Sequence, residues 1–126
     1  MKKMALFLIL IFSLHAQNLY FQAFQDINKA KRIQKENPEK ANQLYIEAYT
    51  YLKQLNNKYI ENNKPSANVM YLLGKLYLNG LGIEKDTIKG AKFLCTSAEL
   101  GNLRAKKDIT KLQIKCEKIN VKELKK

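Results

Sequence analysis

The stretch from Val69 to Gly101 constrains the fold of this 126-residue chain more than any other. It opens with an apolar run, breaks at residues 79–82 (Asn-Gly-Leu-Gly), restarts at Asp86 and stops at Gly101. On both sides of the break the apolar residues recur at helical spacing, first as Val69, Leu72, Leu73 and Leu76, then as Ile88, Ala91, Cys95 and Ala98. The pattern predicts two helices joined by a glycine turn, an αα-hairpin whose inner faces must be buried.

Glycines and one acidic residue refine this hairpin. Glycine inside a helix costs about 1 kcal/mol relative to alanine, so Gly74 indicates a close crossing of two helices. Gly80 and Gly82 allow positive φ in the connection. Asp86 is suited to cap the second helix at its N-terminus.

The same stretch resembles the Sel-one-like repeat (SLR), a relative of the tetratricopeptide repeat. The residues that carry the resemblance are Val69, Leu73, Gly74, Tyr77, Gly80, Gly82, Ile83, Asp86, Lys89, Phe93, Ala98 and Gly101. The chain departs from the family pattern at Gly90, Phe93 and Ser97, where alanine, tryptophan and alanine are common. The resemblance implies an all-α fold, a short α-solenoid of antiparallel helix pairs, which acts as a scaffold for protein–protein contact rather than as a catalyst.

Weaker patterns extend the predicted array on both sides of the clear repeat, which we place at residues 67–101. A helical stripe followed by Asn37-Pro38 and a second stripe predicts a degenerate repeat over residues 24–55. Residues 56–66 are expected to form a loop or a frayed helix end. After Gly101, an apolar stripe predicts a C-terminal capping helix over residues 102–122, which gives about five helices in the mature chain.

The N-terminus reads as a secretory signal peptide over residues 1–16. Met1-Lys2-Lys3 is followed by an apolar run, Met4–Phe12, and by Ser-Leu-His-Ala at residues 13–16. The apolar run is shorter than the ~20 residues that span a bilayer, although an uncleaved anchor is the alternative. We therefore expect residues 17–126 to form the SLR domain, periplasmic or secreted, without stable membrane insertion after cleavage.

The chain is strongly basic, and loss of Lys2 and Lys3 lowers its net charge only from +12 to +10. All but two of its 23 basic residues are lysines, the exceptions being Arg32 and Arg104. Recognition of bases and phosphates favours the planar fork of arginine, so export and composition both argue against nucleic acid as the partner. One face of the predicted capping helix forms a basic stripe of Lys107, Lys111, Lys115, Lys118 and Lys122.

Cys95 and Cys116 are an even pair in a chain that we expect to be exported, which favours a disulfide. A continuous helix over residues 102–122 would instead displace Cys116 by roughly 15 Å along the axis, too far for a bridge. SLR proteins rich in cysteine bridge the end of one helix to the start of the next, where this chain has Ala98 and Ala105. Three outcomes stay open: two buried thiols, a bridge through a bent C-terminal helix, or intermolecular pairing.

The sequence offers little for catalysis, and we predict no catalytic, metal or cofactor site. The only histidine, His15, lies in the segment expected to be removed, so a nucleophile would lack its usual base. Two cysteines without histidine do not make a standard zinc site. No Ser-x-x-Lys motif is present.

These observations favour an exported, non-enzymatic interaction module or scaffold component of a bacterial envelope-associated assembly, with another protein as its partner. In solenoids of this type the first helix of a repeat usually lines the concave face. The predicted partner-facing patch on that helix comprises Asn68, Tyr71, Lys75 and Leu78. The alternatives are a β-lactam- or peptidoglycan-processing enzyme of the cysteine-rich SLR type, and a basic protein that binds anionic lipid or polysaccharide.

Overall fold

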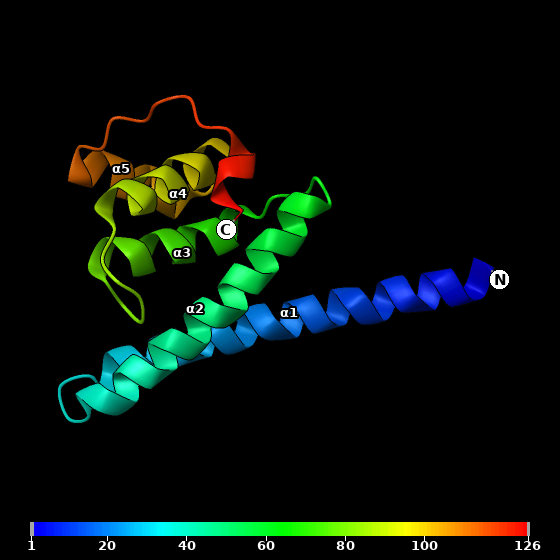
Figure 1. Ribbon diagram of the computed structural model, residues 1–126, viewed down its shortest axis with the longest axis horizontal. Coiled ribbons are helices and arrows are strands. Elements are labelled where there is room, and N and C mark those ends of the chain that lie inside the picture. The colour runs from blue at the N-terminus through cyan, green and yellow to red at the C-terminus, as the bar shows by residue number, and fades with distance from the viewer. Residues whose placement is uncertain (1, 126) are drawn as a thin grey trace.

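The computed structural model describes the backbone of residues 2–125 and the side chains of residues 18–125. This part of the chain is all helical and contains no strand (Figure 1). Its elements are α1 (Lys2–Ile33), α2 (Pro38–Glu61), α3 (Ala67–Asn79), α4 (Thr87–Glu99), α5 (Leu103–Leu112) and a short 3₁₀ helix, η1 (Val121–Leu124). The predicted all-α fold is confirmed. The signal peptide predicted over residues 1–16 lies outside the residues whose side chains are described.

The helices pack as consecutive antiparallel pairs, which confirms the short α-solenoid. Helix α1 packs along α2, α3 packs along α4, and α5 packs on the outer side of α4. Contacts between α2 and α3 join the two hairpins into one stack (Figure 1). None of the helices in the described part of the chain combines the length and the apolar character that a membrane crossing requires.

Side-chain caps fix where the helices begin. Ser66 accepts a hydrogen bond from the backbone N–H of Val69, and Asp86 accepts one from that of Lys89 at 2.9 Å. Asp86 is therefore the N-cap of α4, as predicted. Helix α3 ends at Gly80, whose φ of 62° is the left-handed conformation that glycine adopts without strain.

The α3–α4 hairpin is unusually tight where its two helices cross. A Cβ atom placed on Gly74 would lie 3.1 Å from the carbonyl oxygen of Gly90, and one on Gly90 would lie 2.9 Å from the backbone nitrogen of Leu78. This confirms that Gly74 marks a close crossing. It also explains Gly90, since the alanine common in the family would force the two backbones apart here.

An aromatic stack of Tyr49, Tyr77 and Phe93 joins the two hairpins. The ring of Tyr77 is nearly parallel to that of Phe93, with centroids 5.6 Å apart, and perpendicular to that of Tyr49 at 5.7 Å. The hydroxyl oxygens of Tyr49 and Tyr77 are hydrogen-bonded at 2.9 Å. Because the three rings come from α2, α3 and α4, the stack fixes the second hairpin against the first.

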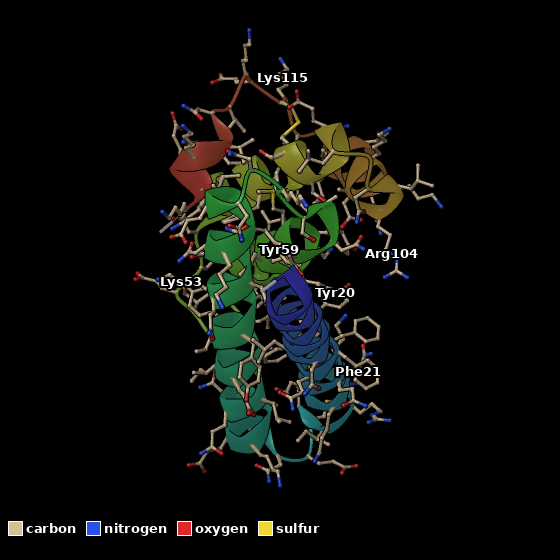
Figure 2. All side chains as sticks on the ribbon, turned by 90° about the vertical axis from the view of Figure 1, so that its right-hand side faces the viewer. Tyr20, Phe21, Lys53, Tyr59, Arg104 and Lys115 are labelled. Atoms are coloured by element: carbon tan, nitrogen blue, oxygen red, sulfur yellow. A yellow bond between two sulfur atoms is a disulfide. The ribbon has the colours of Figure 1, made fainter. Side chains whose placement is uncertain are left out.

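Helix α2 is longer than the sequence indicates. Residues 56–61, expected to be a loop or a frayed end, continue the helix to Glu61. Asn56 is buried and its side-chain amide donates to the carbonyl oxygen of Leu124 at 2.8 Å, while Ile60 belongs to the core. Tyr59, labelled in Figure 2, also packs against this core. These contacts stabilise a turn whose asparagine-rich sequence has little helical preference of its own.

The prediction of a capping helix over residues 102–122 is wrong, because α5 ends at Leu112. Gln113 adopts a left-handed φ of 55°, and the next N–H, that of Ile114, donates to the carbonyl oxygen of Ile109. The chain then turns back across α4 as a C-terminal strap, residues 113–125, that ends in η1 (Figure 1). This path buries Leu124 in the main core, which a straight helix could not reach.

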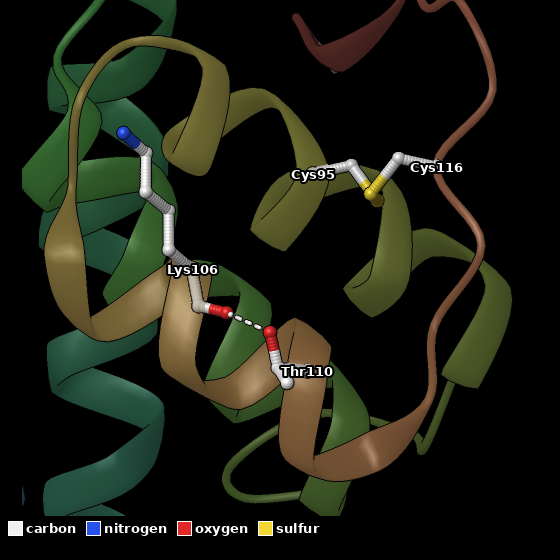
Figure 3. Close-up of a disulfide and its surroundings, with 4 residues drawn as sticks. All are labelled: Cys95, Lys106, Thr110 and Cys116. Carbon is white, nitrogen blue, oxygen red and sulfur yellow. Dashed lines mark hydrogen bonds between the residues drawn. A yellow bond between two sulfur atoms is a disulfide. The ribbon is translucent and has the colours of Figure 1, made fainter.

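A disulfide between Cys95 of α4 and Cys116 holds the strap in place (Figure 3). The two Cα atoms lie 5.5 Å apart. A helix through residue 122 would keep the two cysteines too far apart, but α5 ends at Leu112 and the chain then returns to α4. A second attachment follows at the end of the strap, where Lys125 forms an ion pair with Glu61 of α2 at 2.9 Å.

We expect loss of the disulfide to destabilise the fold without changing its helices. The bridge joins residues separated by 21 positions, and closing a loop of that length in the unfolded chain is worth about 3 kcal/mol. Cys95→Ala/Cys116→Ala should lower the free energy of unfolding by about that amount in urea titrations followed by circular dichroism. Wild type in dithiothreitol should match the variant, and an unchanged midpoint in both would contradict the prediction.

Candidate functional site

A groove runs between α1 and α3 and is closed at one end by the start of α5. It consists of two cavities of about 610 and 180 Å³ that share Phe24, Tyr71, Leu72 and Arg104. Figure 2 shows Tyr20, Phe21 and Arg104 on the same side of the molecule, away from Lys53 of α2. We call this feature the α1–α3 groove.

The arrangement of the hairpins explains why the groove forms there. Helices α1 and α3 are the first helices of the two pairs, and α2 and α4 are the second helices. Helix α5 follows α4 as the first helix of a third pair would, but no second helix follows it in the described part of the chain. When antiparallel pairs stack side by side, the first helices share one face of the stack. The groove follows that face, which agrees with what the SLR resemblance implied for the first helix of a repeat.

The walls of the groove are mainly apolar and aromatic. Ile27, Leu76 and Leu81 line the smaller cavity together with Phe24, and Tyr20 lines the larger one. Phe21 and Leu103 stand at the rim of the larger cavity and are 56% and 70% exposed. Large apolar side chains exposed beside a concave surface are typical of a binding site.

The charged side chains that line the groove are cations. They are Lys31, Lys75 and Arg104, and no carboxylate is among the described residues that line either cavity. Lys75 is neutralised by Asp108 of α5 at 2.9 Å. Burial raises the pKa of Tyr20, against the opposing charge of Arg104, and burial and then Asp108 raise the pKa of Tyr71. Both phenols are therefore protonated at neutral pH.

The predicted partner-facing patch is only partly at this groove. Asn68 and Tyr71 line the larger cavity, and Lys75 lines the smaller one. Leu78 instead lies against Gly90 of α4 in the helix crossing. Asn68 also accepts a hydrogen bond from Asn102 at 3.0 Å and Lys75 is ion-paired, so these two side chains hold α5 against α3.

Sequence reasoning missed Phe21, Leu103 and Arg104, which lie on α1 and at the start of α5. One available signal was the spacing of Tyr20, Phe24, Ile27 and Lys31, which continues the stripe of the first helix toward its N-terminus. A second signal was the restart of the repeat pattern just after Gly101, which places Leu103 and Arg104 at the beginning of another first helix.

The predicted basic stripe does not form one helical face. Only Lys107 and Lys111 lie on α5, whereas Lys115 and Lys118 lie on the extended part of the strap and Lys122 lies in η1. All five are exposed. The helix that was to align them ends at Leu112, so they are spread over three segments.

Neither a cluster of metal-ligating side chains nor a free thiol occurs among the described side chains. Among residues 18–125, no group of three or more His, Cys, Asp or Glu side chains is placed to hold a metal ion. Both cysteines are consumed by the disulfide. His15 lies outside the residues whose side chains are described.

Comparison with known proteins gives a family match that agrees with the all-helical fold. The Sel1 repeat matches residues 31–50 and residues 67–102. The second match covers α3 and α4 up to the cap of α5, and the first covers the end of α1, the turn after it and the first half of α2. No curated protein and no solved structure matches the chain.

A carboxyl pair lies outside the groove, between α1 and α2. One carboxylate oxygen of Asp26 is buried and has no hydrogen-bond partner among the described residues. Burial raises the pKa of Asp26, the nearby Glu47 raises it further, and Lys29 opposes them. Glu47 itself accepts a hydrogen bond from the Tyr51 hydroxyl at 2.7 Å. Neither acid lines the groove, and the two come from neighbouring helices, Asp26 from α1 and Glu47 from α2.

We expect Asp26→Asn to stabilise the protein at neutral pH. The raised pKa means that the folded state holds this proton more tightly than the unfolded chain, so the contribution of Asp26 to stability is full below its ordinary pKa of 3.8 and declines as pH rises through the raised value. The variant should melt at a higher temperature than wild type at pH 7, and this advantage should vanish in acid.

Thermal denaturation followed by circular dichroism measures both effects. Glu36→Gln, at an exposed acid in the turn after α1, is the matched control and should leave the melting temperature unchanged at both pH values. If Asp26→Asn melted below wild type at pH 7, the ionised carboxylate of Asp26 would be stabilising the fold, which contradicts the prediction.

Proposed function

Because the chain is a Sel1-repeat protein, and such repeats generally mediate protein–protein contact, we propose that it is a non-enzymatic docking module that holds a partner protein in the α1–α3 groove. The observation that carries this proposal is the groove itself, built from the first helices of successive hairpins and edged by exposed Phe21 and Leu103. Aromatic side chains are enriched at the cores of protein interfaces, and burial of exposed apolar area such as that of Leu103 favours association.

We further propose that the protein is exported and serves a bacterial envelope-associated assembly, in the periplasm or outside the cell. Two features support this. The N-terminal sequence has the charged start and apolar run of a secretory signal. The Cys95–Cys116 disulfide needs an oxidising compartment to form and persist, as exported proteins have.

Capture of partners from an envelope extract tests the docking surface. Phe21→Ser/Leu103→Ser removes exposed apolar area at the groove without entering the core. We expect this variant to weaken retention of specific partners by about tenfold or more, since truncation of an anchor side chain in an interface costs about 1 kcal/mol or more.

The matched control for this experiment is Ile88→Ser. Ile88 is 72% exposed on α4, outside the groove, so its loss should leave the retained proteins unchanged. If the groove variant retains every partner that wild type retains, the α1–α3 groove is not the docking surface.

The export proposal has its own test. Mass spectrometry of the protein recovered from the periplasm or the medium should show a chain that begins at Gln17, with Cys95 and Cys116 oxidised. Replacing the apolar run with a polar segment should leave the protein inside the cell with its thiols reduced, because the cytosol keeps thiols reduced. Recovery of the full-length chain from the cytosol as the main species would contradict the proposal.

A further inference from the structure

We propose that the partner presents an acidic segment that carries an aromatic side chain, with the ring in the smaller cavity of the α1–α3 groove and flanking carboxylates on Arg104. This inference rests on the proposed docking function and adds the chemistry of the occupant. Three observations support it: the size of the smaller cavity, the sign of the charges along the groove, and the position of Arg104 where the two cavities meet.

The smaller cavity fits one aromatic ring. Its volume of about 180 Å³ is slightly larger than the 150 Å³ of an apolar cavity that holds a benzene molecule. Phe24, Ile27, Leu72 and Leu76 provide apolar walls, and the cavity is the more enclosed of the two. A ring buried there would gain contact on several sides, which a shallow surface does not offer.

The charges along the groove select an acidic partner. Lys31 and Arg104 form no ion pair within the described part of the chain, and no carboxylate lines either cavity. The carboxylate of Asp108 interacts with Tyr71 at the groove, but it already forms an ion pair with Lys75 at 2.9 Å. A partner with carboxylates would therefore meet unpaired cations, whereas a basic partner would meet only repulsion.

Arg104 is placed to link the two parts of such a segment. It lines both cavities, so a residue that enters the smaller one leaves its neighbours in the chain near the guanidinium. The planar guanidinium binds a carboxylate through two parallel hydrogen bonds. The larger cavity of about 610 Å³, with Phe21 and Leu103 at its rim, then accommodates the residues that flank the ring.

A protein segment fits these features better than a polyanion. Nucleic acids and acidic polysaccharides bind along rows of cations, and the exposed lysines at the C-terminal end, Lys107, Lys111, Lys115 and Lys118, lie outside both cavities. The groove combines an aromatic-sized cavity with few cations, which suits a peptide with one anchor and a few acids.

Four fluorescein-labelled peptides of equal length test the proposal on the purified, oxidised protein by fluorescence anisotropy. Their central residue is phenylalanine or alanine, and the flanking residues are glutamate or lysine. We expect the glutamate-flanked phenylalanine peptide to bind most tightly. Exchange of the ring for alanine, or of the acids for lysine, should each weaken binding by about tenfold or more.

Two charge-reversal variants locate the site. Arg104→Glu should weaken binding of the preferred peptide by at least about tenfold, the value of a charge-assisted hydrogen bond. Lys107→Glu changes the same charge on the same helix outside both cavities, and should change the affinity by less than about threefold. Circular dichroism checks whether both variants keep their helices.

The comparison among peptides on wild type decides the chemistry even if a variant fails to fold. Equal binding of all four peptides, or preference for the lysine-flanked ones, would overturn the inference. So would tighter binding of a single-stranded oligonucleotide that Lys107→Glu weakens as much as Arg104→Glu. If no peptide binds while partner capture still depends on Phe21 and Leu103, the docking function stands and the acidic-aromatic occupant is wrong.

Discussion

The contact between the two hairpins is the constraint on which the rest of the structure depends, and the aromatic stack of Tyr49, Tyr77 and Phe93 forms its centre. Burial, followed by the hydrogen bond with Tyr49, raises the pKa of Tyr77, so this phenol stays protonated and the pair stays hydrogen-bonded. The width of the α1–α3 groove is set by how α3 sits relative to the first hairpin. If the stack loosened, α3 would shift relative to α1, and the groove between these two helices would change its width.

The fold of the central hairpin could be predicted because its signals are local. Asp86 caps α4 by accepting a hydrogen bond from the N–H group three residues later, and Gly80 ends α3 through its left-handed backbone conformation. Gly74 marks the crossing of α3 with α4. The end of α5 could not be predicted in the same way. Its stripe continues past Leu112, and the competing contact of Leu124 with Asn56 spans 68 positions of the chain. Tertiary contact of that range overrides helical periodicity without a local signal.

The candidate site could be predicted only in part, for a related reason. Tyr71 and Asn68 lie on the clear repeat, so family resemblance alone places them on the shared face. Phe21 lies on α1 and Arg104 on α5, far apart in sequence, and they meet at one groove only when the helices stack. The lysine stripe failed because five regularly spaced residues share a face only if one helix contains them all.

The C-terminal strap occupies the place where another helix would extend the stack. A cavity between α4, α5 and residues 116–119 shows that the strap follows the open side of both helices, where the second helix of a third hairpin would pack. The disulfide fixes it there by a covalent bond. A further helix could therefore pack against α4 and α5 on this side only if the tethered strap were displaced, so the redox state of two sulfur atoms controls access to this face.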